Sequence, residues 1–330
     1  DPQADAGNLD PLTIRFSNQE SFTVWGVTAT NTAGELRIGS GSEIIAAVQT
    51  KQQVIVFTDR SVSAMQFIGA PFTFGITEVS TNTSIVGQNA AVAVGDSVFW
   101  MGNDVFYRYD GNVTLIPCPV EEYVFNNVNV SQLSKVTAGS NAEFNEVWWF
   151  YPSASSSNND SYVVYNYADK IWFYGTIDRT AWDAGGVSGF PIAASPDGNI
   201  YFQENGFSDG STNPPSAISS FVESSGVDIG DGQQFMSVKQ IIPDIEFRNS
   251  TGTPTATFTL NARTYPGSGT TQTQSGNTVR SVASPVEKYT EKLDVRIRGR
   301  SVSLRVESNQ VGTQWRLGST RLDMRPDGRR

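Results

Sequence analysis

Short apolar runs alternate with turn residues along almost the whole chain. In each run, apolar or aromatic residues either alternate with polar ones or follow one another for a few positions, and Gly, Asn or Asp separates the runs. Side chains of a strand point to opposite faces in turn, so this pattern predicts short β-strands joined by tight turns. Only residues 120–130 suggest a helix, because apolar positions recur there at helical spacing. The candidate strands include 22–27, 54–58 and 146–151.

Four segments in the first two thirds of the chain share one plan. Each has an apolar strand, a turn, a second strand that ends in aromatic residues, and a short return strand. The segments start about 45–55 residues apart, close to the roughly 40–50 residues of a propeller blade. This repeat favours a β-propeller over a sandwich of generic hairpins. The segments are 44–68, 91–116, 136–175 and one that begins at Ile192.

The composition of the sequence and the length of its expected strands change near Pro214-Pro215. Residues 206–215 are typical of a loop or domain boundary, because paired prolines resist strand pairing. The strands expected beyond this point are longer and less aromatic, and about five of them suit a small β-sandwich. The sequence therefore predicts an all-β protein, with propeller blades over residues 1–215 and a β-sandwich over residues 216–330.

Two residue counts exclude much catalytic chemistry. The chain has no histidine and one cysteine, Cys118, which excludes imidazole catalysis, His-ligated zinc, an intramolecular disulfide and a thiolate cluster. No stretch approaches the roughly 18 apolar residues of a membrane span, so we expect no membrane insertion. Pairs of carboxylates remain, but their spacing carries no signal, and we expect no enzyme, cofactor or metal. The carboxylates considered are Glu121, Glu122, Glu143, Glu146, Asp178 and Asp183.

Charge is distributed unevenly along the chain. The net charge is −10, which disfavours adhesion to nucleic acid or anionic membranes, yet arginines crowd the last part of the sequence. Arg296, Arg298 and Arg300 alternate, so on a strand they share one face, which either pairs with carboxylates of a neighbouring subunit or phosphate or is simply solvated. The predicted subunit-contact residues are Arg296, Arg298, Arg300, Arg316, Arg321, Arg325, Arg329 and Arg330.

Aromatic residues are densest between positions 148 and 174. On a strand, Trp148 and Phe150 point one way and Trp149 and Tyr151 the other, so one set can fill the space between adjacent blades. The alternative is a platform on which a sugar stacks. We favour the core interpretation, since an aromatic stripe usually fills a core.

Several aromatic-rich stretches and the arginine-rich end of the sequence share their wording with a known group of proteins. These stretches are Phe99 to Gly102, Phe106 to Gly111, Phe144 to Pro152, Tyr162 to Tyr167, Trp172, Arg179 to Trp182, Trp315 to Gly318 and Arg325 to Arg330. They resemble virion proteins of short-tailed bacteriophages, in the family that forms the tail tube, hub or nozzle below the portal, also called packaged-DNA stabilisation proteins. The resemblance covers most of residues 15–330, and its motifs are structural rather than catalytic.

The resemblance implies a structural role in a phage tail. Propellers with an added β domain would form a homo-oligomeric ring, a hexamer by the family's pattern, that retains the genome and conducts it on ejection. The expected partners are portal, adaptor and other tail proteins, with viral DNA passing without specific binding, and the expected location is the virion tail after synthesis in the bacterial host cytoplasm. Arg15-Phe16-Ser17 looks like a strand from the middle of a propeller, so further blades are expected to precede it.

Two other functions stay open on sequence grounds. One is a receptor-binding propeller that binds or degrades carbohydrate, and the other is a secreted, non-viral β-protein. The structural role predicts aromatic side chains buried between blades, whereas a carbohydrate site predicts exposed aromatics and carboxylates that converge on one pocket.

Overall fold

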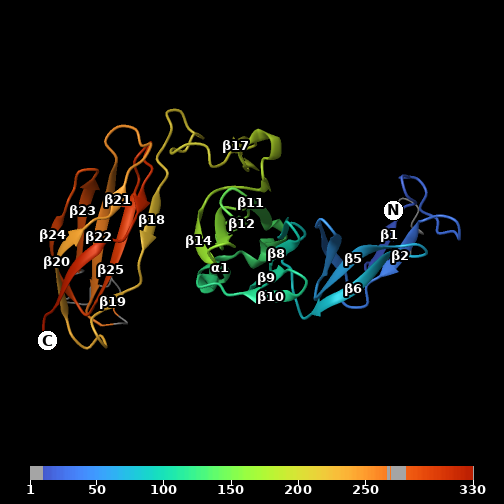
Figure 1. Cartoon of the computed structure of the whole chain (residues 1–330), viewed down its shortest axis with the longest axis horizontal. Coiled ribbons are helices and arrows are strands. Elements are labelled where there is room, and N and C mark those ends of the chain that lie inside the picture. The colour runs from blue at the N-terminus through green and yellow to red at the C-terminus, as the bar shows by residue number, and fades with distance from the viewer. Residues whose placement is uncertain (1–9, 266–267, 269–279, 330) are drawn as a thin grey trace. The chain divides into compact units, whose positions relative to one another are not determined.

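The fold is built almost entirely from antiparallel strands, which confirms the all-β prediction. The computed structural model describes residues 10–265, 268 and 280–329. Within those ranges the regular structure other than strands is one short α-helix, α1 (Glu121–Asn127), and two 3-10 turns. The chain divides into two compact units, Asp1–Glu204 and Asn205–Arg330 (Figure 1).

The first unit contains three four-stranded sheets, each a simple antiparallel meander. A two-stranded sheet, β1-β2, precedes them along the chain and a three-stranded sheet, β15-β16-β17, follows. No sheet in the described part of the chain closes on itself. The strands are β1 (Thr13–Phe16), β2 (Gly34–Arg37), β3 (Ile44–Gln49), β4 (Gln53–Thr58), β5 (Ser61–Gly69), β6 (Thr73–Thr81), β7 (Ala91–Val94), β8 (Ser97–Met101), β9 (Phe106–Tyr109), β10 (Val113–Ile116), β11 (Thr137–Asn141), β12 (Glu146–Tyr151), β13 (Ser161–Asn166), β14 (Ile171–Thr176), β15 (Ala181–Asp183), β16 (Ile192–Ala194) and β17 (Ile200–Phe202).

Turn chemistry sets the register of these meanders. Val94 pairs with Ser97, which leaves a two-residue connection whose first residue, Gly95, has a φ of +64°. A tight hairpin of this kind needs positive φ there, and glycine adopts it without steric cost. The fourth segment begins at Ala181 rather than at the predicted Ile192, because β15 has three residues with mostly exposed side chains and so lacks an apolar signal.

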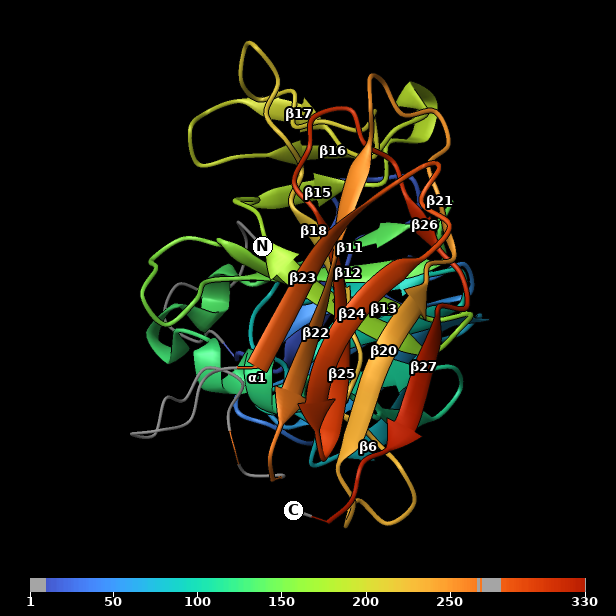
Figure 2. The same ribbon diagram turned by 90° about the vertical axis from the view of Figure 1, so that its left-hand side faces the viewer.

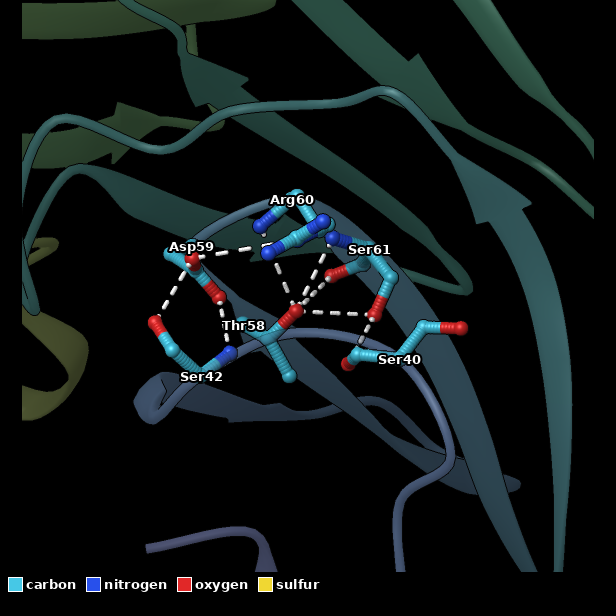
Figure 3. A network of polar contacts seen from close by, with 6 residues as sticks. All are labelled: Ser40, Ser42, Thr58, Asp59, Arg60 and Ser61. Carbon is cyan, nitrogen blue, oxygen red and sulfur yellow. Dashed lines mark hydrogen bonds and ion pairs between the residues drawn. The ribbon is translucent and has the colours of Figure 1, made fainter.

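A polar network fastens the β4–β5 turn to the segment before β3 (Figure 3). The backbone N–H of Ser42 donates to Asp59 Oδ1 over 2.7 Å, and the Ser42 hydroxyl donates to Oδ2 over 2.8 Å. The Thr58 and Ser61 hydroxyls lie 2.8 Å apart, and Ser61 Oγ donates to the Ser40 carbonyl. The two bonds from Ser42 lower the pKa of Asp59, since they favour its ionised form.

Successive sheets of the first unit contact one another through their first strands. β3 lies beside β7, β7 beside β11, and β11 beside β15. Polar side chains also link neighbouring sheets. Gln53 Nε2 on β4 donates to Tyr109 Oη on β9 over 2.7 Å, and Trp149 Nε1 on β12 donates to the Ala90 carbonyl, directly before β7, over 3.1 Å. Trp182 Nε1 donates to a carbonyl of β11 over 2.9 Å. One apolar core runs through all three four-stranded sheets.

The second unit has two larger sheets, whose strands are labelled in Figure 2, and they share one apolar core. One has the order β18-β25-β22-β23, with β19 also paired to β25, and the other has the order β24-β20-β27; β21 and β26 form a separate pair. β22 alternates strictly between buried and half-buried residues, as a strand with one face in a core should. The strands are β18 (Ser220–Glu223), β19 (Val227–Asp228), β20 (Met236–Ile242), β21 (Ile245–Glu246), β22 (Thr255–Arg263), β23 (Arg280–Glu287), β24 (Leu293–Gly299), β25 (Ser301–Ser308), β26 (Arg316–Leu317) and β27 (Arg321–Pro326).

The loop 206–215 belongs to the second unit. Asp209 and Ser216 exchange two backbone hydrogen bonds of 2.9 and 3.0 Å, and the Ser208 hydroxyl accepts one of 2.8 Å from the backbone N–H of Gly312. The division between the units therefore lies before this loop, whereas the sequence places it after the paired prolines. The prolines interrupt strand pairing without separating the loop from the fold that follows.

Candidate functional site

The arginine row of β24 lies on the outer face of its sheet. Val295 and Ile297 are buried in the core, so Arg296 and Arg298, which alternate with them, point the other way. Arg296 is exposed and Arg298 is half-buried. Arg300 comes one residue after the strand ends, in the turn to β25.

Two arginines of this row hold the end of the chain against β24. Arg298 Nε lies 2.6 Å from Asp327 Oδ2, and its Nη2 donates to the Asp327 carbonyl over 2.9 Å. Arg300 Nη2 donates to the Arg329 carbonyl over 3.2 Å. Both guanidinium groups also contact the Phe235 ring, at 4.1 and 4.6 Å from its centroid. Arg298 and Arg300 therefore have a role within the protomer, whatever else they contact.

The remaining predicted arginines are dispersed. Arg316 on β26 pairs in register with Glu246, Arg321 opens β27, and both are exposed. Arg325 Nη2 lies 3.1 Å from Asp323 Oδ2, and this hydrogen-bonded ion pair raises the pKa of Arg325. Arg330 lies outside the described residues.

A pocket of about 470 Å³ opens beside the arginine row. Its lining includes Arg296 and Arg298 and adds Arg280, from the start of β23, with the hydroxyl residues Ser237 and Ser281. Arg280 Nη1 donates to the Arg298 carbonyl over 3.0 Å, which fixes the orientation of its guanidinium group. Arg280 was not among the predicted site residues, because its place in the pocket depends on which strands become neighbours.

A second cluster, in the first unit, combines aromatic rings with carboxylates. The rings of Trp148 and Trp182 stack with centroids 5.4 Å apart, and Tyr162 lies 4.9 Å from Trp148. Trp148 Nε1 donates to Glu146 Oε2 over 3.0 Å. Burial, and to a lesser extent the charge of Glu204, raises the pKa of Glu146 to about 7 against the opposing effect of the hydrogen bond from Trp148.

Glu204 is a functional candidate that the sequence did not single out. Burial, and secondarily the charge of Glu143, raises its pKa. Its charge acts on Glu146 only because of the fold, since the two residues are far apart in the sequence, and no local motif marks them. Of the other predicted carboxylates, Glu121 and Glu122 lie in the first turn of α1.

Of the ten aromatic residues in the predicted cluster, four are buried, five are half-buried and one, Phe173, is exposed. Trp149 and Tyr151 are fully buried, and Trp149 packs against Phe106 at 4.9 Å and Trp172 at 6.0 Å between ring centroids. Trp148 lies on the opposite face, where other rings of the same unit contact it. The buried rings therefore pack between sheets, whereas Trp148 and Trp182 are half-buried, with the Glu146 carboxyl bonded to the Trp148 indole.

The described residues form neither a metal-binding cluster nor a membrane-spanning helix. Among them, no group of three or more His, Cys, Asp or Glu side chains is placed to hold a metal ion. Burial raises the pKa of the Cys118 thiol to about 11, so it is a poor nucleophile at neutral pH. No helix in the described part of the chain is long and apolar enough to cross a membrane.

Comparison with known proteins leaves the family undefined. No protein-family model matches the sequence, and no curated protein is similar to it. Among solved structures, the chain is similar to a hemopexin-fold protein, CP4, from cow pea, at 12% identity and a TM-score of 0.26, over 48% of this chain and 92% of that one. It is also similar to a plant lectin with two metal-binding sites from Cicer arietinum, at 10% identity and a TM-score of 0.25, over 46% of this chain and 82% of the lectin.

Proposed function

We propose that this chain is a structural virion protein of a phage tail. In this proposal its first unit consists of propeller blades, its second is a β-sandwich, and copies assemble into a ring that serves as hub or nozzle for genome retention and ejection. It would join portal, adaptor and other tail proteins in the virion, and DNA would pass without specific binding. The chain itself would carry no catalytic residues and no cofactor.

The arrangement of the first unit supports the propeller. Three four-stranded meanders follow one another, and the first strand of each sheet lies beside the first strand of the next. Blades around a common axis have this relation, since each blade begins with its innermost strand. The repeat length in the sequence points the same way.

The proposal of a structural role rests on one observation, which is that the aromatic side chains are buried and hydrogen-bonded between sheets. Trp149, Tyr151 and Phe106 are fully buried between sheets, and the Trp149 and Trp182 indoles bond to the backbone of a neighbouring sheet. Side chains committed in this way rigidify a scaffold and are not free to bind a ligand. The resemblance to tail proteins rests on the same aromatic stretches.

The test is the mass of the purified full-length protein in solution. Light scattering would be measured on the protein alone and after mixing with the portal and adjoining tail proteins from the same genome. A closed ring under either condition, with six subunits expected, supports the proposal. A monomer or a trimer under both conditions contradicts it.

A second candidate function is carbohydrate binding by the first unit. It is favoured by one observation, the half-buried Glu146 carboxyl hydrogen-bonded to Trp148 beside the Trp182 ring. A carboxyl with a raised pKa next to an indole suits recognition or cleavage of a glycoside. Screening the full-length protein on a glycan array tests it, with Glu146→Gln as the variant that should lose any signal and Glu121→Gln as the control.

A further inference from the structure

The pocket beside β24 has an excess of positive charge. Three guanidinium groups line it, from Arg280, Arg296 and Arg298, and its one carboxylate is Asp327. Asp327 is already engaged, because its Oδ2 lies 2.6 Å from Arg298 Nε. Two positive charges therefore remain over the pocket without a carboxylate from its own wall.

The guanidinium groups that carry these two charges, on Arg280 and Arg296, can donate hydrogen bonds to an anion in the pocket. Arg280 is held by the bond from its Nη1 to the Arg298 carbonyl, which leaves its other N–H groups available. Within the described residues, neither Arg280 nor Arg296 forms an ion pair, and both are exposed. A guanidinium fork pairs best with a carboxylate or a phosphate, to which it donates two parallel hydrogen bonds. The hydroxyls of Ser237 and Ser281 add further donors to the same pocket.

The chain itself carries the complementary charge on its other unit. Residues 1–204 contain 8 Lys and Arg against 21 Asp and Glu, a net charge of −13. Residues 205–330 contain 15 Lys and Arg against 12 Asp and Glu, a net charge of +3. Opposite net charges on two units of one chain favour head-to-tail association, in which the basic unit of one copy meets the acidic unit of another.

We infer that the Arg280–Arg296–Arg298 pocket binds a surface carboxylate from the first unit of a second copy of this chain. This inference rests on the proposed function, because it supplies the contact that joins copies in the ring. A heterologous contact of this kind repeats around a ring until it closes. Nucleic acid fits the pocket less well, since a DNA strand bound there would also meet a chain of net charge −10.

The experiment measures association of the full-length protein by analytical ultracentrifugation. The test variant is Arg280→Ala with Arg296→Ala, and the matched control is Lys239→Ala with Lys288→Ala, which removes the same charge from exposed positions of the second unit outside the pocket. Loss of paired interfacial charges should raise the dissociation constant of the copy–copy contact by roughly 30-fold or more. The control should change it by no more than about threefold. Circular dichroism checks that both variants fold, and Arg296→Ala alone serves as a milder second variant.

The outcomes separate this inference from the proposed function. If the wild-type protein associates and the pocket variant does not, the inference is supported. If the pocket variant associates as tightly as the wild type, or if the control weakens association equally, the inference is overturned while the ring remains. If the wild type stays a monomer alone and with its tail partners, the proposed function is overturned as well. The inference about the pocket is also overturned if a short DNA duplex binds in a way that depends on Arg280 and Arg296 while the association of copies is unchanged in the pocket variant.

Discussion

Replacing Trp149 with Phe tests the claim that this side chain joins two sheets of the first unit. Trp149 is fully buried on β12, and its Nε1 donates to the Ala90 carbonyl, directly before β7, over 3.1 Å. The backbone N–H of Met101 also donates to that carbonyl, so the substitution leaves the acceptor with one partner. The change therefore removes one buried hydrogen bond and part of one ring without orphaning a polar group.

The expected cost combines these two losses. A net hydrogen bond contributes about 1 kcal/mol, and the smaller ring leaves a cavity that costs about 1–2 kcal/mol against Phe106 and Trp172. The unfolding free energy of the first unit should thus fall by about 2–3 kcal/mol. For a unit of this size, that corresponds to a decrease in Tm of roughly 5–10 °C.

The assay is differential scanning calorimetry of the full chain, with Trp25→Phe as the matched control. The Trp25 indole is half-buried, and its Nε1 donates to the Phe22 carbonyl, a local bond three residues away. This control should lower Tm by no more than about 2 °C, since exposed local bonds contribute little. Equal shifts for the two variants would refute the argument that Trp149 holds the sheets together.

Three further predictions concern single residues of the first unit. Because burial raises the pKa of Glu146 to about 7, its contribution to stability is present below the unfolded pKa near 4.5 and is lost as the pH rises through 7. Thermal melts of Glu146→Gln should therefore match the wild type at pH 5 and exceed it at pH 8, and a constant difference would contradict the assignment. The pKa of Asp59 is lowered instead, so the stability it contributes is present at neutral pH. Asp59→Asn should therefore reduce Tm at pH 7, and this effect should disappear as the pH falls below about 4. Gly139→Ala should destabilise the protein by about 1–3 kcal/mol in urea denaturation, because a Cβ there meets the Trp182 ring, whereas Gly26→Ala has open space and should be near neutral.

Strand positions were predictable where strands are buried on both faces. β12 begins and ends at the predicted residues 146 and 151, because its apolar and aromatic side chains pack on both sides of the sheet. The stretch 22–27 was predicted as a strand and is not one. Phe22 is 88% exposed there, and the backbone is held by local turns rather than by a partner strand. Apolar character alone did not distinguish the two.

The candidate site was predictable only in part. The alternation of Arg296 and Arg298 with apolar residues indicated their shared face, because side-chain direction on a strand follows from sequence. That Asp327 and Phe235 would engage Arg298, and that Arg280 would join the pocket, depends on which strands become neighbours. The influence of the Glu204 charge on Glu146 depends on long-range packing in the same way.

Electron microscopy of the purified full-length protein, alone and with its portal and tail neighbours, tests the central claim most directly. The proposed function predicts ring-shaped particles with a central opening, in which the propeller-like unit of each copy repeats around the axis. Particles of one copy without a channel under both conditions would contradict the ring, and glycan binding at Glu146 would then be the next property to measure.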